Sequence, residues 1–205
     1  MTAKEYFSPL GVVVSSGRQG DLLLIRGFVD MDVYQKGKFV ERICRRNVIF
    51  NQGKSEVIRS LSSGTSKVLA RMAIGDRGAL PSDPTVPKTP DATLTKLYSE
   101  IYRKDVDVTS ITTSGSANEF LLVATFKAVD IPLSAYSDQT NPVVNEVGLI
   151  MIDQITGAPL PRPPVASPGI PDSDELVFSL RTYKSVPFEA ANETAVTVRY
   201  TIFIG

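Results

Sequence analysis

The sequence predicts a mainly β protein, an antiparallel β-sandwich with two short helices and a long proline-rich loop. Short runs rich in Val, Ile, Phe and Tyr recur along the chain, separated by turns of Gly, Pro, Asn and Asp. Only two segments have helical spacing, and neither an internal repeat nor a heptad pattern is visible. The 205 residues can bury a core of their own, so we expect one domain over 1–205.

The first predicted element is a hairpin. Residues 22–34 and the run "FVERIC" form its strands, and Lys36-Gly37 is the turn, in which glycine supplies a positive φ. Residues 1–46 are thus a candidate docking hairpin. Cys44 is the sole cysteine, which excludes an internal disulfide, and we expect its thiol to be buried.

A short extended piece at 47–50 leads into the first predicted helix, which Asn51 caps and Gly64 ends. The helix has three apolar residues on one face: Val57, Ile58 and Leu61. The run "KVLARMAIG" then predicts a strand over 67–75.

Pro81 to Pro90 contains four prolines and no apolar periodicity, which indicates a loop. The second helix is predicted after it, capped by Asp91 or Thr93. Its apolar residues fall at i, i+3, i+4 and i+7 and are expected to pack the helix on a sheet: Leu94, Leu97, Tyr98 and Ile101. The remaining strands are expected at 104–113, 119–129, 143–153, 175–183 and 194–204.

The segment 157–174 is unusually rich in proline. Its prolines are Pro159, Pro161, Pro163, Pro164, Pro168 and Pro171. Proline restricts φ and lowers the entropy lost on ordering, which suits an extended arm laid on a partner. Two interpretations stay open: an exposed loop, or an arm that contacts a neighbouring subunit.

Composition excludes several classes of function. Lys plus Arg and Asp plus Glu both number 22, so there is no net charge to attract nucleic acid or an anionic membrane. There is no histidine, which removes the commonest general base and the usual zinc ligand. No run approaches the roughly 20 apolar residues of a membrane span, and no secretory signal is visible. We therefore expect a protein made in the cytoplasm, with no cofactor, metal, nucleic acid or membrane.

The motif Gly75-Asp76-Arg77-Gly78 invites comparison with a phosphate-binding loop. Such a loop needs Gly-x-x-x-x-Gly-Lys-Ser/Thr running directly into a helix, and neither feature is present. The motif is therefore interpreted as a turn, in which Asp76 bonds nearby backbone N–H groups.

Charged groups offer two further candidates. The acid pairs Asp30/Asp32 and Asp105/Asp107 could each share one strand face and bind a cation or share a proton, although no third ligand is evident. The alternative is a solvated strand face or edge. A basic group could contact an acidic partner or simply be solvated: Lys38, Arg42, Arg45 and Arg46. Nothing in the sequence supports catalysis.

Three segments resemble the phage tail-collar fibre family, the attachment domain of many tail fibres. They are "MAIGDRG" with its following loop and "TLTKLYSEIYRKDVDV", then "NEVGLIMIDQITGAPL", then "RTYKSVPFEAANETAVTVRYTIFI". The preceding "NVIFNQGKSEVIRSL" is similar to the opening of small phage virion proteins. The resemblance implies that Gly75 and Gly148 allow a turn or close packing. It also implies that Glu146 bonds to nearby backbone N–H groups, and the alternative is that Glu146 is simply exposed.

The resemblance also implies a function. The chain would be a non-enzymatic structural component of a tailed-phage virion, in the tail, baseplate or collar, as a fibre-attachment or adaptor protein. Its partners would be other virion proteins, and it would form a homotrimer. Fibres of that family continue into a long shaft, which this sequence does not include, so we expect attachment rather than receptor binding.

Two alternatives remain. A capsid decoration (cement) protein is also a small β-rich trimer. A carbohydrate-binding or hydrolytic β-sandwich is disfavoured, since sugar sites usually stack a ring on an aromatic and the chain has no Trp.

Overall fold

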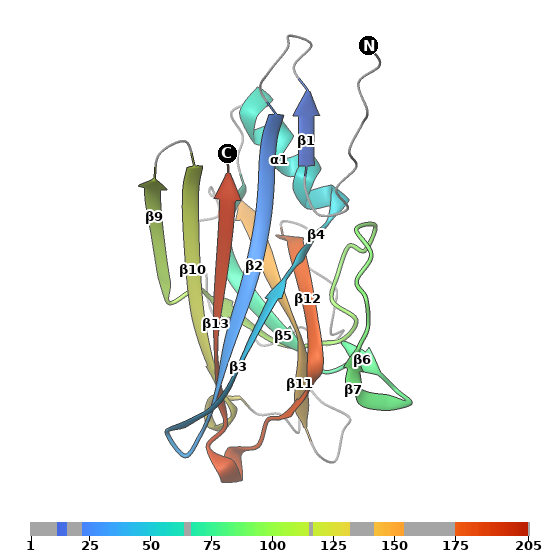
Figure 1. The fold of residues 1–205 in the computed structure, drawn as a ribbon, viewed down its shortest axis with the longest axis vertical. Coiled ribbons are helices and arrows are strands. Elements are labelled where there is room, and N and C mark those ends of the chain that lie inside the picture. Colours follow the sequence, from blue (N-terminus) through green and yellow to red (C-terminus); the bar gives the residue numbers. More distant parts are fainter. Residues whose placement is uncertain are drawn as a thin grey trace.

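The computed structural model describes residues 12–15, 22–63, 67–114, 117–131, 142–153 and 175–204. Over these residues the protein is mainly β, with two antiparallel sheets packed face to face and one α-helix. Figure 1 shows the two sheets as layers, with helix α1 at one end of the molecule. The predicted β-sandwich class is confirmed.

The six-stranded sheet is organised around β13, which pairs with β2 on one side and β10 on the other. At one edge β9 pairs with β10. At the other edge β1 and β3 both pair with the long strand β2, one after the other. The strands of this sheet are β1 (Val12–Ser15), β2 (Leu22–Gln35), β3 (Lys38–Arg46), β9 (Val108–Ser114), β10 (Ala117–Lys127) and β13 (Ala195–Ile204).

The five-stranded sheet has the order β4-β12-β11-β5-β8. Its strands are β4 (Val48–Ile49), β5 (Lys67–Gly75), β8 (Glu100–Asp105), β11 (Val143–Asp153) and β12 (Glu175–Pro187). The remaining elements are the helix α1 (Asn51–Ser63), the small hairpin β6 (Ala79–Leu80) and β7 (Asp83–Pro87), and the 3₁₀ turns η1 (Ala128–Asp130) and η3 (Ala190–Asn192).

The main core lies between the two sheets and follows from strand alternation. On β13 every second residue is buried: Val196, Val198, Tyr200 and Ile202. The Tyr200 hydroxyl donates a hydrogen bond of 3.1 Å to the Val147 carbonyl of β11, which joins the two sheets. A second cluster covers the outer face of the five-stranded sheet: Phe50, Ala73, Leu97, Ile150, Val177 and Leu180.

Several predicted elements are confirmed. The turn between β2 and β3 has positive φ at both Lys36 (48°) and Gly37 (72°), which is the two-residue turn that matches strand twist. The predicted strand at 67–75 has the bounds of β5, and helix α1 begins at Asn51. The predicted last strand, 194–204, corresponds to β13, which lies in the interior of the six-stranded sheet.

The second predicted helix is wrong. Residues 91–99 form turns and bends, and Ile101 lies in strand β8. Leu97 and Ile101 are both buried, but Leu97 belongs to the outer cluster and Ile101 to the core between the sheets. Leu94 and Tyr98 are partly buried and pack against the outer cluster. The apolar spacing thus reflects two separate burial sites, one in a loop and one in a strand.

Three smaller expectations also need correction. Residues 81–90 contain the strand β7, so they are only partly loop. Ile58 is 45% exposed and does not share the buried face of Val57. Cys44 is exposed rather than buried, because it lies on β3 at the edge of the sheet. The proline-rich segment 157–174 lies outside the described residues.

Candidate functional site

The Gly75–Gly78 loop is fastened to its surroundings by its own backbone. The Asp76 N–H donates to the Ser99 carbonyl at 3.1 Å, and the Gly78 N–H donates to the Asn145 side-chain oxygen at 2.5 Å. The Arg77 N–H donates to the Glu146 carboxylate. A phosphate-binding loop needs such N–H groups free for its ligand, so this geometry argues against a nucleotide site.

Glu146 is the centre of this anchoring. Its carboxylate is fully buried and accepts hydrogen bonds from the N–H groups of Tyr98 (2.9 Å) and Ser99 (2.7 Å) as well as Arg77. Burial raises the pKa of Glu146 to about 7, and the three hydrogen bonds oppose that rise only in part. The expected bonding of Glu146 to backbone N–H groups is therefore seen.

Two glycines make room for these contacts. A Cβ on Gly75 would lie 2.2 Å from the Ser99 carbonyl oxygen and 2.4 Å from a Glu146 carboxylate oxygen. A Cβ on Gly148 would lie 2.5 Å from Leu97 Cδ1. Both positions need glycine for close packing.

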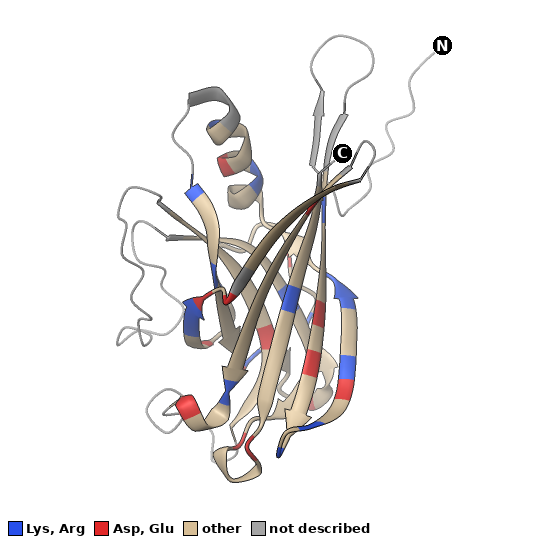
Figure 2. Cartoon of the chain, turned by 90° about the vertical axis from the view of Figure 1, so that its left-hand side faces the viewer, with Lys and Arg blue, Asp and Glu red and all other residues tan. Residues whose placement is uncertain are grey.

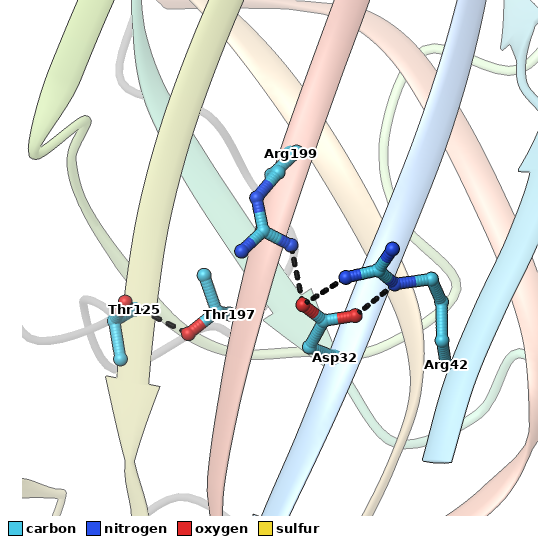
Figure 3. A network of polar contacts seen from close by, with 5 residues as sticks. All are labelled: Asp32, Arg42, Thr125, Thr197 and Arg199. Carbon is cyan, nitrogen blue, oxygen red and sulfur yellow. Dashed lines mark hydrogen bonds and ion pairs between the residues drawn. The ribbon is translucent and has the colours of Figure 1, made fainter. Parts of the chain in front are cut away.

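The outer face of the six-stranded sheet carries a charged cluster around Asp32. This carboxylate accepts two hydrogen bonds from Arg42 of β3, at 2.6 and 3.0 Å, and one from Arg199 of β13, at 2.6 Å. Figure 3 shows Asp32 between the two guanidinium groups, beside a 3.0 Å hydrogen bond between Thr125 and Thr197. The Arg42 hydrogen bonds lower the pKa of Asp32, although burial opposes them.

Basic side chains pair with three of the four acids in the pairs Asp30/Asp32 and Asp105/Asp107. Asp32 is 1% exposed and forms ion pairs with Arg42 and Arg199. Asp105 forms an ion pair with Arg71 at 2.8 Å, and Asp107 binds Lys104. Within the described residues no group of three His, Cys, Asp or Glu side chains is placed to hold a metal ion.

Two members of the basic group of β3, Arg42 and Arg45, line a cleft. This cleft has a volume of about 450 Å³ and lies between β3, β7 and β12. Its lining residues are Glu41, Arg42, Ile43, Cys44, Arg45, Thr85, Pro87, Tyr183 and Lys184. Lys184 reaches the Glu41 carboxylate at 2.7 Å. Figure 2 faces the six-stranded sheet, and its red and blue bands mark charged residues on adjacent strands of that sheet.

Sequence reasoning found parts of this region and missed others. It named Asp32 and Arg42 separately but not their contact, and it did not single out Arg199, which lies 167 residues from Asp32 in the sequence. Lys184 was also missed. The one available signal was the alternation of β13, which places Arg199 on the face opposite to the buried Val198 and Tyr200.

Comparisons with known proteins do not assign the chain to a family. No protein-family model matches the chain, and no curated protein matches it in sequence. The helix in the described part of the chain is too short and polar to cross a membrane. The functional interpretation therefore depends on the residues and their geometry.

Proposed function

We propose that this protein is a non-enzymatic structural component of a tailed-phage virion, an attachment or adaptor protein of the tail, baseplate or collar. It assembles as a homotrimer with other virion proteins as partners. It works by holding surfaces together, through a rigid sandwich whose edges and loops are the contact regions.

One observation carries this proposal: the three segments of the family resemblance meet at Glu146. Glu146 stands opposite Gly75 of the first segment in the β5–β11 pairing. The Glu146 carboxylate also accepts hydrogen bonds from the N–H groups of Tyr98 and Ser99, which lie in the first segment as Gly75 does. On its other side it stands opposite Thr182 of the third segment. Short similarities that lie far apart in sequence thus form one buried unit, which supports a shared fold over chance likeness.

Mass spectrometry of purified particles tests the proposal. Tailed-phage particles from the source that encodes this chain are purified, and the copy number of the protein is measured against the major capsid protein. A few to a few dozen copies supports the tail location, and hundreds of copies would instead support capsid decoration. Absence from the particles would refute both.

Two further measurements address the rest of the proposal. Light scattering on the purified chain should give the mass of a trimer, alone or once its partner is added; an inert monomer that never joins particles contradicts it. A glycan array should show no binding, whereas a specific glycan signal would favour the carbohydrate-binding alternative.

A further inference from the structure

The strand β3 has an edge with which none of the described strands pairs. The Asn47 N–H, just beyond β3, donates to the Gly27 carbonyl, which fixes the alternation of the ladder with β2. In an antiparallel pair every second residue directs its N–H and C=O away from the partner strand. Arg42, Cys44 and Arg46 are therefore the residues whose backbone groups face outward.

This outward edge borders the cleft between β3, β7 and β12. Arg181 of β12 already donates to the Arg46 carbonyl at 3.0 Å. Arg42 and Cys44 both line the cleft. An added strand there would have β3 as its neighbour and Thr85 and Lys184 alongside.

The charges around the cleft are unbalanced. Arg42 and Lys184 have carboxylate partners, but Arg45 forms no ion pair with any described residue. The positive charge of Arg45 contributes to lowering the pKa of the half-buried Arg181, and burial contributes more. The buried Nε of Arg181 also has no hydrogen-bond acceptor among the described residues. Arg45 in the lining of the cleft, and Arg181, which donates to the neighbouring Arg46 carbonyl, thus have no carboxylate partner among the described residues.

We propose that the edge of β3 is a docking site for an extended acidic segment of another protein, which adds to the sheet as a further strand. Its backbone bonds to Arg42 and Cys44, and its carboxylates lie against Arg45 and Arg181. This deepens the proposed function, on which it rests, by giving the chemistry of one partner. A second copy of β3 is a poor occupant, because pairing two basic edges would bring like charges together.

The test uses the full chain and short fluorescein-labelled peptides in which Glu alternates with Val or Thr. Fluorescence anisotropy should show binding that weakens as salt rises. A peptide with Lys in place of Glu should not bind. The acidic peptide with alternate backbone nitrogens methylated should also fail, since it keeps the charges but cannot pair along an edge.

Two variants locate the site, each with a matched control. Cys44→Pro removes an outward N–H that the β2 ladder does not use, and Cys44→Thr keeps it. Arg45→Glu reverses the charge at the cleft, and Lys127→Glu makes the same change at an exposed site on β10. We expect Cys44→Pro and Arg45→Glu each to weaken binding by about tenfold or more, and both controls to bind as the parent does.

Amide exchange measured by NMR gives an independent signal. The N–H groups of Arg42 and Cys44 should exchange quickly in the free protein and slowly with the acidic peptide. Equal binding of the methylated peptide, no binding of any acidic peptide, or self-association abolished by Cys44→Pro would each overturn the inference. Its failure is distinct from failure of the virion proposal, which particle mass spectrometry decides.

Discussion

Replacing Glu146 by Gln should remove a pH dependence from the stability of the protein. In the folded protein this carboxylate is fully buried, and its pKa is raised from an ordinary 4.5 to about 7. The folded state therefore holds the Glu146 proton more tightly than the unfolded state does. Gln cannot ionise, so the titration is removed. Its NH₂ group cannot accept the N–H of Tyr98 or of Ser99, which the two carboxylate oxygens accept in the parent, so the variant should also be less stable at every pH. The change with pH, and not the absolute stability, therefore reports the charge.

The direction and size follow from linkage between proton binding and folding. Because the folded pKa is the higher one, the contribution of Glu146 is fully present below pH 4.5 and is lost as pH rises through about 7. At roughly 1.4 kcal/mol for each pH unit, the free energy of unfolding should fall by about 3 kcal/mol from this group. The Gln variant should show no such fall.

Urea unfolding followed by circular dichroism, at a series of pH values, measures this directly. The chain has no histidine, so few other groups titrate in this range. Asp32, Asp83 and Asp91 have pKa values lowered from 3.8 and therefore titrate below it. Glu193→Gln, at an exposed position, is the matched control and should keep the parent slope. Parallel stability curves for the parent and Glu146→Gln would refute the reasoning.

Three further predictions concern other parts of the molecule. Asp32→Ala should lower the free energy of unfolding by about 1–3 kcal/mol in urea titrations, because it leaves two arginines without their shared acceptor; an unchanged midpoint would show that solvent replaces the carboxylate fully. Gly75→Ala should cost about 1–3 kcal/mol, because the new methyl group meets the Ser99 carbonyl, and a crystal structure of the variant should show the loop displaced. Replacing 160–171 with a short Gly-Ser linker should leave the melting temperature nearly unchanged and weaken incorporation into particles. Full incorporation of the shortened chain would mean that this segment is only a connection.

Local patterns in the sequence were enough for most of the strands and for the first turn. The strand predicted at 104–113 is wrong, because the structure divides it between β8 and β9, which belong to different sheets. Lys36-Gly37 is a two-residue turn that contains glycine and lies between two β-rich runs, so the turn and its flanking residues are enough to predict the hairpin. The alternation along 195–204 likewise predicts one buried face. These features depend on neighbours in the chain, which the sequence shows directly.

The error at 94–101 shows where local pattern is insufficient. Leu97 is buried because Gly148, fifty-one residues later, leaves space for it, and Ile101 is buried by the opposite side of the same sheet. Helical spacing cannot distinguish one apolar face from two unrelated sites. Cys44 was misplaced for a similar reason, since only the strand order shows that β3 lies at an edge.

The candidate site was harder still to predict. Asp32 and Arg42 face each other across a hairpin, within reach of sequence reasoning, but Arg199 arrives from a strand near the other end of the sequence. The cleft needs β7 and β12 as well as β3. Which charges remain unbalanced is therefore a property of the assembled sheets.

The central place of β13 has a consequence for synthesis of the chain. Strand β2 emerges from the ribosome early, and its hairpin partner β3 follows at once, but its other neighbour is made about 160 residues later. At about 5–20 residues per second, that side of β2 stays without its partner for roughly 10–30 s. Pairings this distant in sequence also form slowly. During that interval the nascent chain carries a strand edge with unpaired N–H and C=O groups and an uncovered apolar face, which are the features that make unfinished chains prone to aggregate.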